Sequence, residues 1–170
     1  FTFINKLDRP SQDPLDLLDE IEKVLEMEAV PVNWPIGDGP NFRGIYDRST
    51  RTVHLFDRTI HNQSISPETT FELDDERLAN ELSAKQRDEL LSSVELLDGL
   101  GIDFDHEFTL AGEQTPVFFG SALTNFGVQL FMNSLVEFAP PPGSFATDSG
   151  VVSPEQEDFS GFVFKIQANM

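Results

Sequence analysis

Hydrophobic residues in this chain follow two kinds of pattern, short unbroken runs and stretches with helical spacing. Residues 1–4 and 116–119 are almost wholly apolar, which predicts two buried strands of a parallel sheet. Apolar residues three or four positions apart predict helices that begin at Asp13-Pro14, at Ser83 and near residue 128. Together these elements indicate an α/β fold in which helices flank a parallel sheet.

The helical spacing also identifies the side chains expected to face the core. A capping box from Ser83 to Gln86 begins the second helix, and Gly99 is expected to end it. The side chains expected to point inward are Leu17, Leu18, Ile21, Val24 and Leu25, then Leu90, Leu91, Val94 and Leu97, and finally Val128, Phe131, Met132, Leu135, Val136 and Phe138.

Residues 30–112 mix short strand, loop and helix patterns. Segments 42–47 and 52–56 read as the two strands of a hairpin, whereas 61–70 is polar, contains Pro and is expected to be a loop. Short helices are expected at 77–82 and 104–110.

The loops that follow the two apolar strands lie 113 positions apart (121 − 8). A single helical crossover between parallel strands needs only a few tens of residues, so the sequence predicts an insertion. The strand patterns at both ends are expected to continue in a longer protein. The predicted parts are a nucleotide-binding domain at 1–29 and 113–139, an inserted α+β subdomain at 30–112, a linker at 140–157 and the start of a further domain at 158–170.

The first loop, Asn5-Lys6-Leu7-Asp8, has the composition of a guanine-reading site. Guanine presents an N1–H and an exocyclic N2 amino group side by side, and one ionised carboxylate can accept from both. Adenine would leave Asp8 unpaired, which discriminates between the bases by roughly 10⁴–10⁵. Asn5 is expected to serve the O6/N7 edge and to tie neighbouring loops together, and the stem of Lys6 to cover the ring face.

The second loop, Gly120-Ser121-Ala122-Leu123, follows the other apolar strand. Small side chains at Ser121 and Ala122 would let a backbone N–H approach the guanine O6. A four-residue motif alone is a weak signal, because polar turns often follow strands. Two matching loops after two matching strands favour a guanine site, and its expected residues are Asn5, Lys6, Leu7, Asp8, Ser121, Ala122 and Leu123.

Composition limits the partners of the chain. Its 170 residues carry 30 acidic and 11 basic side chains, for a formal charge of −19. That balance argues against direct binding to nucleic acid and favours basic protein surfaces. The lack of cysteine excludes disulfides, thiolate metal sites and cysteine nucleophiles. No apolar run approaches membrane-spanning length, and a reducing cytoplasm is the expected location.

Residues 103–107 bring three acids together, as a metal or acid–base site would. The glycine before them and the spacing of their phenylalanines instead favour a helix start, where acids complement the helix dipole. His54, His61 and His106 have no ligand spacing relative to one another. Ser121 has no evident His or Asp partner in sequence for nucleophilic catalysis. No catalytic or metal-binding residue is therefore assigned.

Over nearly its whole length the sequence is similar to the translational GTPases. The Trp before Pro35-Ile36-Gly37 and the F-K-I-Q-A-N-M ending resemble the release-factor branch of that family rather than the elongation factor G branch. Elongation factor G shares the N-K-x-D loop, a related P-I-G segment, the G-S-A loop and the insertion. The segments that carry the resemblance are 2–9, 34–37, Phe42, 44–46, 110–113, 115–123, 125–128 and 162–170.

The resemblance implies the C-terminal half of a P-loop-type GTPase domain that carries the insertion and is followed by the first strand of a β-barrel domain. It implies GTP or GDP as the ligand and a role on the ribosome at translation termination, where such a protein promotes departure of the codon-reading release factors. The phosphate-binding loop, both switch segments and the water-positioning His of the family have no counterpart in this sequence. We therefore expect the chain alone to bind the guanine base weakly, to lack the Mg²⁺ site of a full-length protein and not to hydrolyse GTP.

Two other functions stay open at this point. The chain could come from an elongation factor G-type translocase or ribosome-protection GTPase, or it could be an acidic module that docks on ribosomal proteins. An interaction module would have no need for the acceptor-only Asp8. If the two apolar strands are interior strands without their neighbours, the exposed sheet edge is expected to cause self-association.

Overall fold

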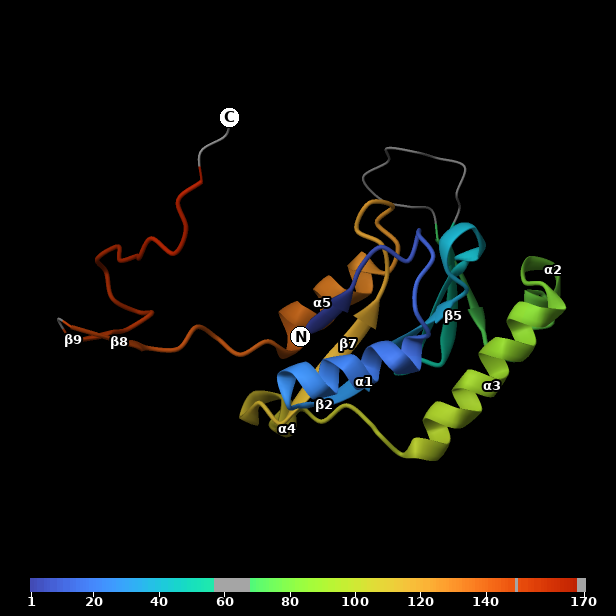
Figure 1. Cartoon of the computed structure of the whole chain (residues 1–170), viewed down its shortest axis with the longest axis horizontal. Helices are drawn as coiled ribbons and strands as arrows, with labels where there is room; N and C mark the ends of the chain where they lie inside the picture. The colour runs from blue at the N-terminus through green and yellow to red at the C-terminus, as the bar shows by residue number, and fades with distance from the viewer. Residues whose placement is uncertain (57–67, 149, 168–170) are drawn as a thin grey trace. The chain divides into compact units, whose positions relative to one another are not determined.

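The computed structural model describes residues 1–56, 68–148 and 150–167, which fall into two compact units, Phe1–Phe138 and Ala139–Met170 (Figure 1). The helices are α1 (Pro14–Leu25), α2 (Leu78–Glu81), α3 (Ala84–Leu100), α4 (His106–Ala111) and α5 (Val128–Phe138), with a 3₁₀ turn η1 (Gly39–Asn41). The strands are β1 (Thr2–Ile4), β2 (Glu28–Pro31), β3 (Asn33–Ile36), β4 (Gly44–Asp47), β5 (Thr52–Phe56), β6 (Glu68–Glu72), β7 (Gln114–Phe119), β8 (Phe145–Thr147) and β9 (Gly150–Val152).

A parallel sheet in the order β1-β7-β2 carries the two predicted strands. On one side of β7, Phe3 lies opposite Phe118, and on the other side Val30 lies opposite Pro116. The expected α/β fold, with the two apolar runs as neighbouring parallel strands, is confirmed. The sequence pattern does not predict β2, because its four residues follow the end of α1 too closely to show a strand period.

Side chains of β7 alternate between the two faces of this sheet. Phe118 lies on the face covered by α5, where the ring of Phe131 is 5.3 Å from Phe118 and 5.2 Å from Phe3, centroid to centroid. Val117 and Phe119 point the other way and are fully buried in the main core.

The second sheet is antiparallel, in the order β3-β4-β5-β6. The predicted hairpin corresponds to β4 and β5, and the Asp47 side chain holds its turn by accepting from the Ser49 N–H at 2.9 Å. The loop expected at 61–70 is wrong for 68–70, because these residues belong to β6 and pair with β5. Two threonines there suit an edge strand whose outward residues are polar, so the hydrophobic pattern gives no sign of it. Residues 61–67 lie outside the described part of the chain.

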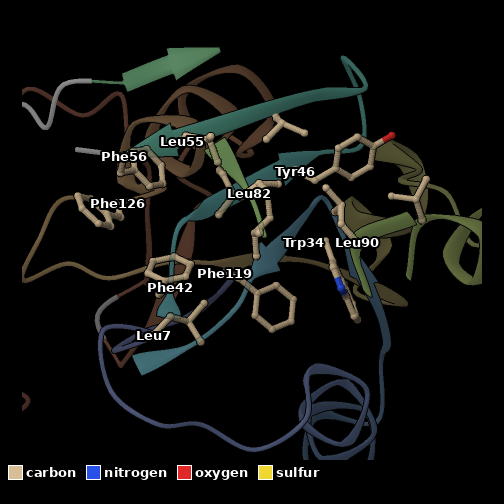
Figure 2. Close-up of a cluster of buried hydrophobic side chains, with 14 of the residues drawn as sticks. Leu7, Trp34, Phe42, Tyr46, Leu55, Phe56, Leu82, Leu90, Phe119 and Phe126 are labelled. Atoms are coloured by element: carbon tan, nitrogen blue, oxygen red, sulfur yellow. The ribbon is translucent and has the colours of Figure 1, made fainter. Parts of the chain in front are cut away.

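One hydrophobic cluster joins both sheets to α1, α2 and α3 (Figure 2). The ring of Trp34 on β3 meets the ring of Phe119 on β7 edge-on at 5.5 Å. Phe56, at the end of β5, stacks on Phe126 at 4.4 Å. The cluster therefore extends from the junction of the two sheets to the loop that follows β7.

Several helix predictions need correction. The capping box at Ser83 and Gln86 is present, but α3 continues through Gly99, and Gly101 takes the left-handed C-cap conformation with φ 64°. Each helix covers its sheet or neighbouring helices with a narrower apolar stripe than the spacing implied, so residues at the stripe's edge stay in water. The residues expected inside but found exposed are Val24, Leu25, Leu91, Met132 and Val136.

The second unit contains one small hairpin, β8 with β9, inside the segment for which the sequence predicts a linker. Its strands have three residues each, too few to produce a recognisable alternation. Residues 162–167 form no strand, although the alternating pattern of residues 162–170 predicts one. A strand requires a neighbour, and the described residues place none against this segment. Residues 168–170 lie outside the described part.

Candidate functional site

The loops that follow β1 and β7 lie side by side because the strands that precede them are paired (Figure 1). The Gly120 N–H donates to the Ile4 carbonyl at 3.0 Å, and the Leu7 N–H donates to the Gly120 carbonyl at 3.2 Å. Leu7 is only 1% exposed and belongs to the main core, as Figure 2 shows. Of the predicted site residues, Leu7 is therefore an anchor for the first loop, and its side chain does not face a ligand.

Asn5 ties the two loops together, as its position predicts. Its Oδ1 accepts hydrogen bonds from the Lys6 N–H at 2.8 Å and from the Ala122 N–H at 2.9 Å. Lys6 has a positive φ of 73°, which turns the chain sharply after Asn5. Because Asn5 Oδ1 already accepts from two backbone N–H groups, the side-chain NH₂ group of Asn5 is the part that can donate to a ligand.

Asp8 and Ser121 join the loops a second time. The Ser121 hydroxyl donates to Asp8 Oδ1 at 2.6 Å. The backbone of Ser121 is paired with Phe126 in both directions, at 2.9 and 3.0 Å, which closes the second loop on itself. The bond from Ser121 fixes the carboxylate of the half-buried Asp8 and leaves its second oxygen and the outer lone pair of the first for a donor-rich ligand.

The Asp8 contact also corrects one sequence-based statement, that Ser121 lacks an Asp partner. The partner exists, but the Ser121 side chain is fully buried beneath the loop. A nucleophile must reach its substrate, so nucleophilic catalysis by Ser121 is excluded by burial rather than by the lack of a base. The side chains of Lys6, Ala122 and Leu123 are exposed at the same place.

Two glycines allow the second loop to fold this tightly. A Cβ on Gly120 would lie 2.3 Å from the Phe126 carbonyl oxygen and 2.9 Å from the Phe3 ring. Gly127 has φ +74°, and a Cβ there would lie 2.7 Å from the Phe119 carbonyl oxygen. Any other residue at either position would push the second loop away from the strands.

Asn33 supports the loops from the core and is a residue that sequence reasoning missed. It is fully buried at the start of β3, where its Oδ1 accepts from the Phe119 N–H at 2.7 Å and its Nδ2 donates to the Phe119 carbonyl at 3.1 Å. The signal was one polar residue in the otherwise apolar run 32–36. A buried amide requires partners, but the sequence does not say which.

The acidic segment 103–107 has a structural role. Asp105 caps α4, accepting from the N–H groups of Glu107 and Phe108 at 2.8 and 3.1 Å. Asp103 lies 3.5 Å from the guanidinium of Arg48. Within the described ranges, no three His, Asp or Glu side chains come together in a way that could hold a metal ion, so no residue here is assigned to Mg²⁺.

The described histidines also have structural partners. His106 Nε2 lies 3.0 Å from the carbonyl oxygen of Phe138, at the last residue of α5. His54 on β5 pairs through Nδ1 with Glu68 on β6, and that hydrogen bond raises the pKa of His54 against the opposing effect of burial. His61 lies outside the described residues.

Comparison with known proteins identifies the family. The model of the elongation factor Tu GTP binding domain matches residues 1–141. The chain belongs to the elongation factor Tu GTP-binding domain family. The translational GTPase resemblance drawn from segments along the chain is thereby confirmed, and the fold is that of part of a GTP-binding domain.

Curated relatives of this family match the whole chain. Proteins named peptide chain release factor 3 are 55% identical in Gloeobacter violaceus, 50% in Trichodesmium erythraeum and 49% in a Cyanothece species, each over 100% of this chain. The chain spans 32% of the length of the first and 31% of the other two, about a third in each case. The resemblance to the release-factor branch is confirmed by these names.

A solved structure supports the same fold. The crystal structure of a protein from Thermus thermophilus is similar with a TM-score of 0.52 and 17% identity, over 89% of this chain and 29% of that one. Within the described residues, none of the helices of this chain combines the length and the apolar character needed to cross a membrane.

Proposed function

We propose that the loops 5–8 and 120–123 bind the guanine base of GTP or GDP. Asp8 would accept from the guanine N1–H and N2 amino group, and the Asn5 NH₂ group and the backbone N–H of Leu123 would donate toward O6 and N7. The exposed stem of Lys6 would cover the ring. The observation that carries this proposal is the 2.6 Å hydrogen bond from Ser121 to Asp8, which fixes an acceptor-only group where the two loops meet.

We further propose that these residues serve a GTPase that acts in the cytoplasm on the ribosome at translation termination, promoting departure of the codon-reading release factors. The supporting observation is the identity of about half of all positions with proteins named peptide chain release factor 3, along the whole chain. An elongation factor G-type function is the less supported alternative, since none of the relatives named above carries that name.

The test of base recognition is a titration of this chain with fluorescent GDP and fluorescent ADP, with wild type and two variants. Wild type is expected to bind the guanine analogue at least tenfold more tightly, and Asp8→Asn to lose that preference. Asp19→Asn, which neutralises an exposed acid on α1, is the charge-matched control and should bind like wild type. Equal binding of both bases by a folded wild type would contradict the proposal and favour the acidic docking module instead.

We also propose that this chain self-associates through β1. On one side β1 pairs with β7, and in the described residues no strand lies against its other side. An unpaired strand edge that carries the partly buried Phe3 and Ile4 is a ready site for pairing with a second copy. Light scattering over a range of concentrations tests this, and a monomer at the highest concentration would rule it out.

A further inference from the structure

The turn of residues 38–42, which includes η1, lies against the first base-reading loop. The Gly39 N–H donates to the Leu7 carbonyl at 2.8 Å. The Ser11 N–H donates to Asp38 Oδ2 at 2.8 Å. These two bonds hold the segment that contains Asp8 from both of its ends, because Leu7 precedes Asp8 and Ser11 follows it.

The turn is tightly folded and closely packed. Gly37 has φ +74°, and a Cβ there would lie 2.4 Å from the Asn41 carbonyl oxygen. Gly39 has φ +51°, and a Cβ there would lie 3.1 Å from the backbone nitrogen of Pro10. The turn therefore has little freedom to move independently of the first loop.

The same turn supports the second base-reading loop. Phe42 is fully buried, with its ring 5.9 Å from the ring of Phe126 (Figure 2). Phe126 is the residue whose backbone pairs with Ser121 and closes the second loop. The two loops thus rest on one short turn.

The other side of the turn meets α3. The Gln86 Nε2 donates to the Asn41 carbonyl at 3.0 Å. The Oε1 of the same side chain accepts from the Ser83 N–H at 3.2 Å, as part of the capping box that begins α3. One side chain therefore links the first turn of α3 to the turn of residues 38–42.

We propose that the turn of residues 38–42 positions both base-reading loops and couples them to the start of α3, with Asp38 and Gln86 as the positioning residues. This inference rests on the proposed guanine recognition. A base held by Asp8 restrains the first loop, the turn and the first turn of α3 together. Coupling between two binding sites is reciprocal. A partner that binds the start of α3 therefore changes the affinity for guanine by the same factor by which guanine changes the affinity for that partner.

Binding measurements test the positioning role. Asp38→Ala removes the acceptor of the Ser11 N–H and is expected to weaken guanine binding about fivefold, the net value of one ordinary hydrogen bond. Asp38→Asn keeps an oxygen acceptor and should restore most of the affinity. The guanine-over-adenine ratio should not change in either variant, because Asp8 selects the base. Asp74→Ala, at an exposed acid after β6, is the control.

Hydrogen exchange tests the coupling with a readout that a merely structural role does not move. In wild type, added GDP should slow exchange of the Gly39 amide and of the amides at the start of α3. Gln86→Glu keeps the Oε1 that caps Ser83 but loses the donor to Asn41. In this variant the slowing should persist at Gly39 and disappear in α3.

The outcomes separate the two proposals. If the wild-type chain shows no preference for guanine over adenine, the proposed function itself is wrong. A wild type that prefers guanine, with unchanged affinity in Asp38→Ala and unchanged α3 protection in Gln86→Glu, overturns the coupling alone. If Asp38→Ala proves unfolded by circular dichroism, the Gln86→Glu exchange experiment still decides, because that variant retains the capping box.

Discussion

The side chain of Asn33 hydrogen-bonds to both backbone groups of Phe119, with Oδ1 accepting from the N–H at 2.7 Å and Nδ2 donating to the carbonyl at 3.1 Å. Asn33 is the first residue of β3, and Phe119 is the last residue of β7. The pair therefore joins the antiparallel sheet to the parallel sheet immediately before loop 120–123 begins.

Replacing Asn33 by Ala should destabilise the protein by about 2–4 kcal/mol, because the buried N–H and carbonyl of Phe119 would lose these side-chain partners. The free energy of unfolding in urea measures this. Asn80→Ala, at an exposed amide on α2, is the matched control and should change stability by less than about 0.5 kcal/mol. A loss below about 1 kcal/mol in Asn33→Ala would show that water replaces the missing amide.

Asp8→Asn should change the preferred base and not only weaken binding. The Asn side chain presents an NH₂ donor, which suits a base with a carbonyl at C2 in place of the amino group of guanine. We expect the variant to bind a xanthine nucleotide more tightly than the guanine nucleotide, the reverse of wild type. Competition between the two nucleotides measures the ratio, and an unchanged guanine preference would show that Asp8 does not contact the base.

Ser83→Ala should cost about 1 kcal/mol, since the Gln86 N–H loses its side-chain acceptor at the start of α3. Urea unfolding measures the change. Ser92→Ala, at an exposed position within α3, is the control and should be neutral or slightly stabilising because Ala is the better helix former. Equal effects of the two changes would mean that the cap contributes nothing.

The His54–Glu68 pair should give stability that depends on pH. The hydrogen bond with Glu68 raises the pKa of His54 in the folded protein. The added stability is therefore fully present below the unfolded pKa of about 6.5 and is lost as the pH rises through the higher folded pKa. Because Glu68 is partly exposed, the effect should be on the order of 0.5 kcal/mol.

Urea unfolding of wild type and Glu68→Gln between pH 5.5 and 8.5 measures this difference. Wild type should be the more stable at low pH, and the gap should close at high pH. Glu72→Gln, at the other end of the same strand, is the control, because the acid that bonds to His54 is Glu68. A gap that widens with pH would contradict the assignment.

The sequence predicts those features whose signals are local. The capping box at Ser83 and the two loops after apolar strands appear where the pattern puts them, and the helix expected at 104–110 is found at 106–111. The sequence pattern does not reveal β6 and β2, because each is defined by pairing with another strand rather than by an alternation of apolar and polar residues of its own.

Partners of buried polar groups could not be predicted for a related reason. Asn33 and Phe119 lie 86 positions apart, and the turn at Gly39 meets Leu7 only because both segments leave the sheets at the same place. The Asn5 contact with the second loop was predictable, since two strands that pair in parallel bring their following loops together.

The topology of the two sheets also sets the order in which the protein can fold. Strands of the antiparallel sheet follow one another along the chain, whereas Glu28 and Gln114 are 86 positions apart and Thr2 and Thr115 are 113 apart in the parallel sheet. Closing such long loops costs entropy before any contact compensates for it. The parallel sheet should therefore assemble last, when Trp34, the single tryptophan, meets Phe119. Loops 5–8 and 120–123 become neighbours only at that final step, so under the proposed base recognition a nascent chain could not bind guanine before β7 and the loop after it have been made.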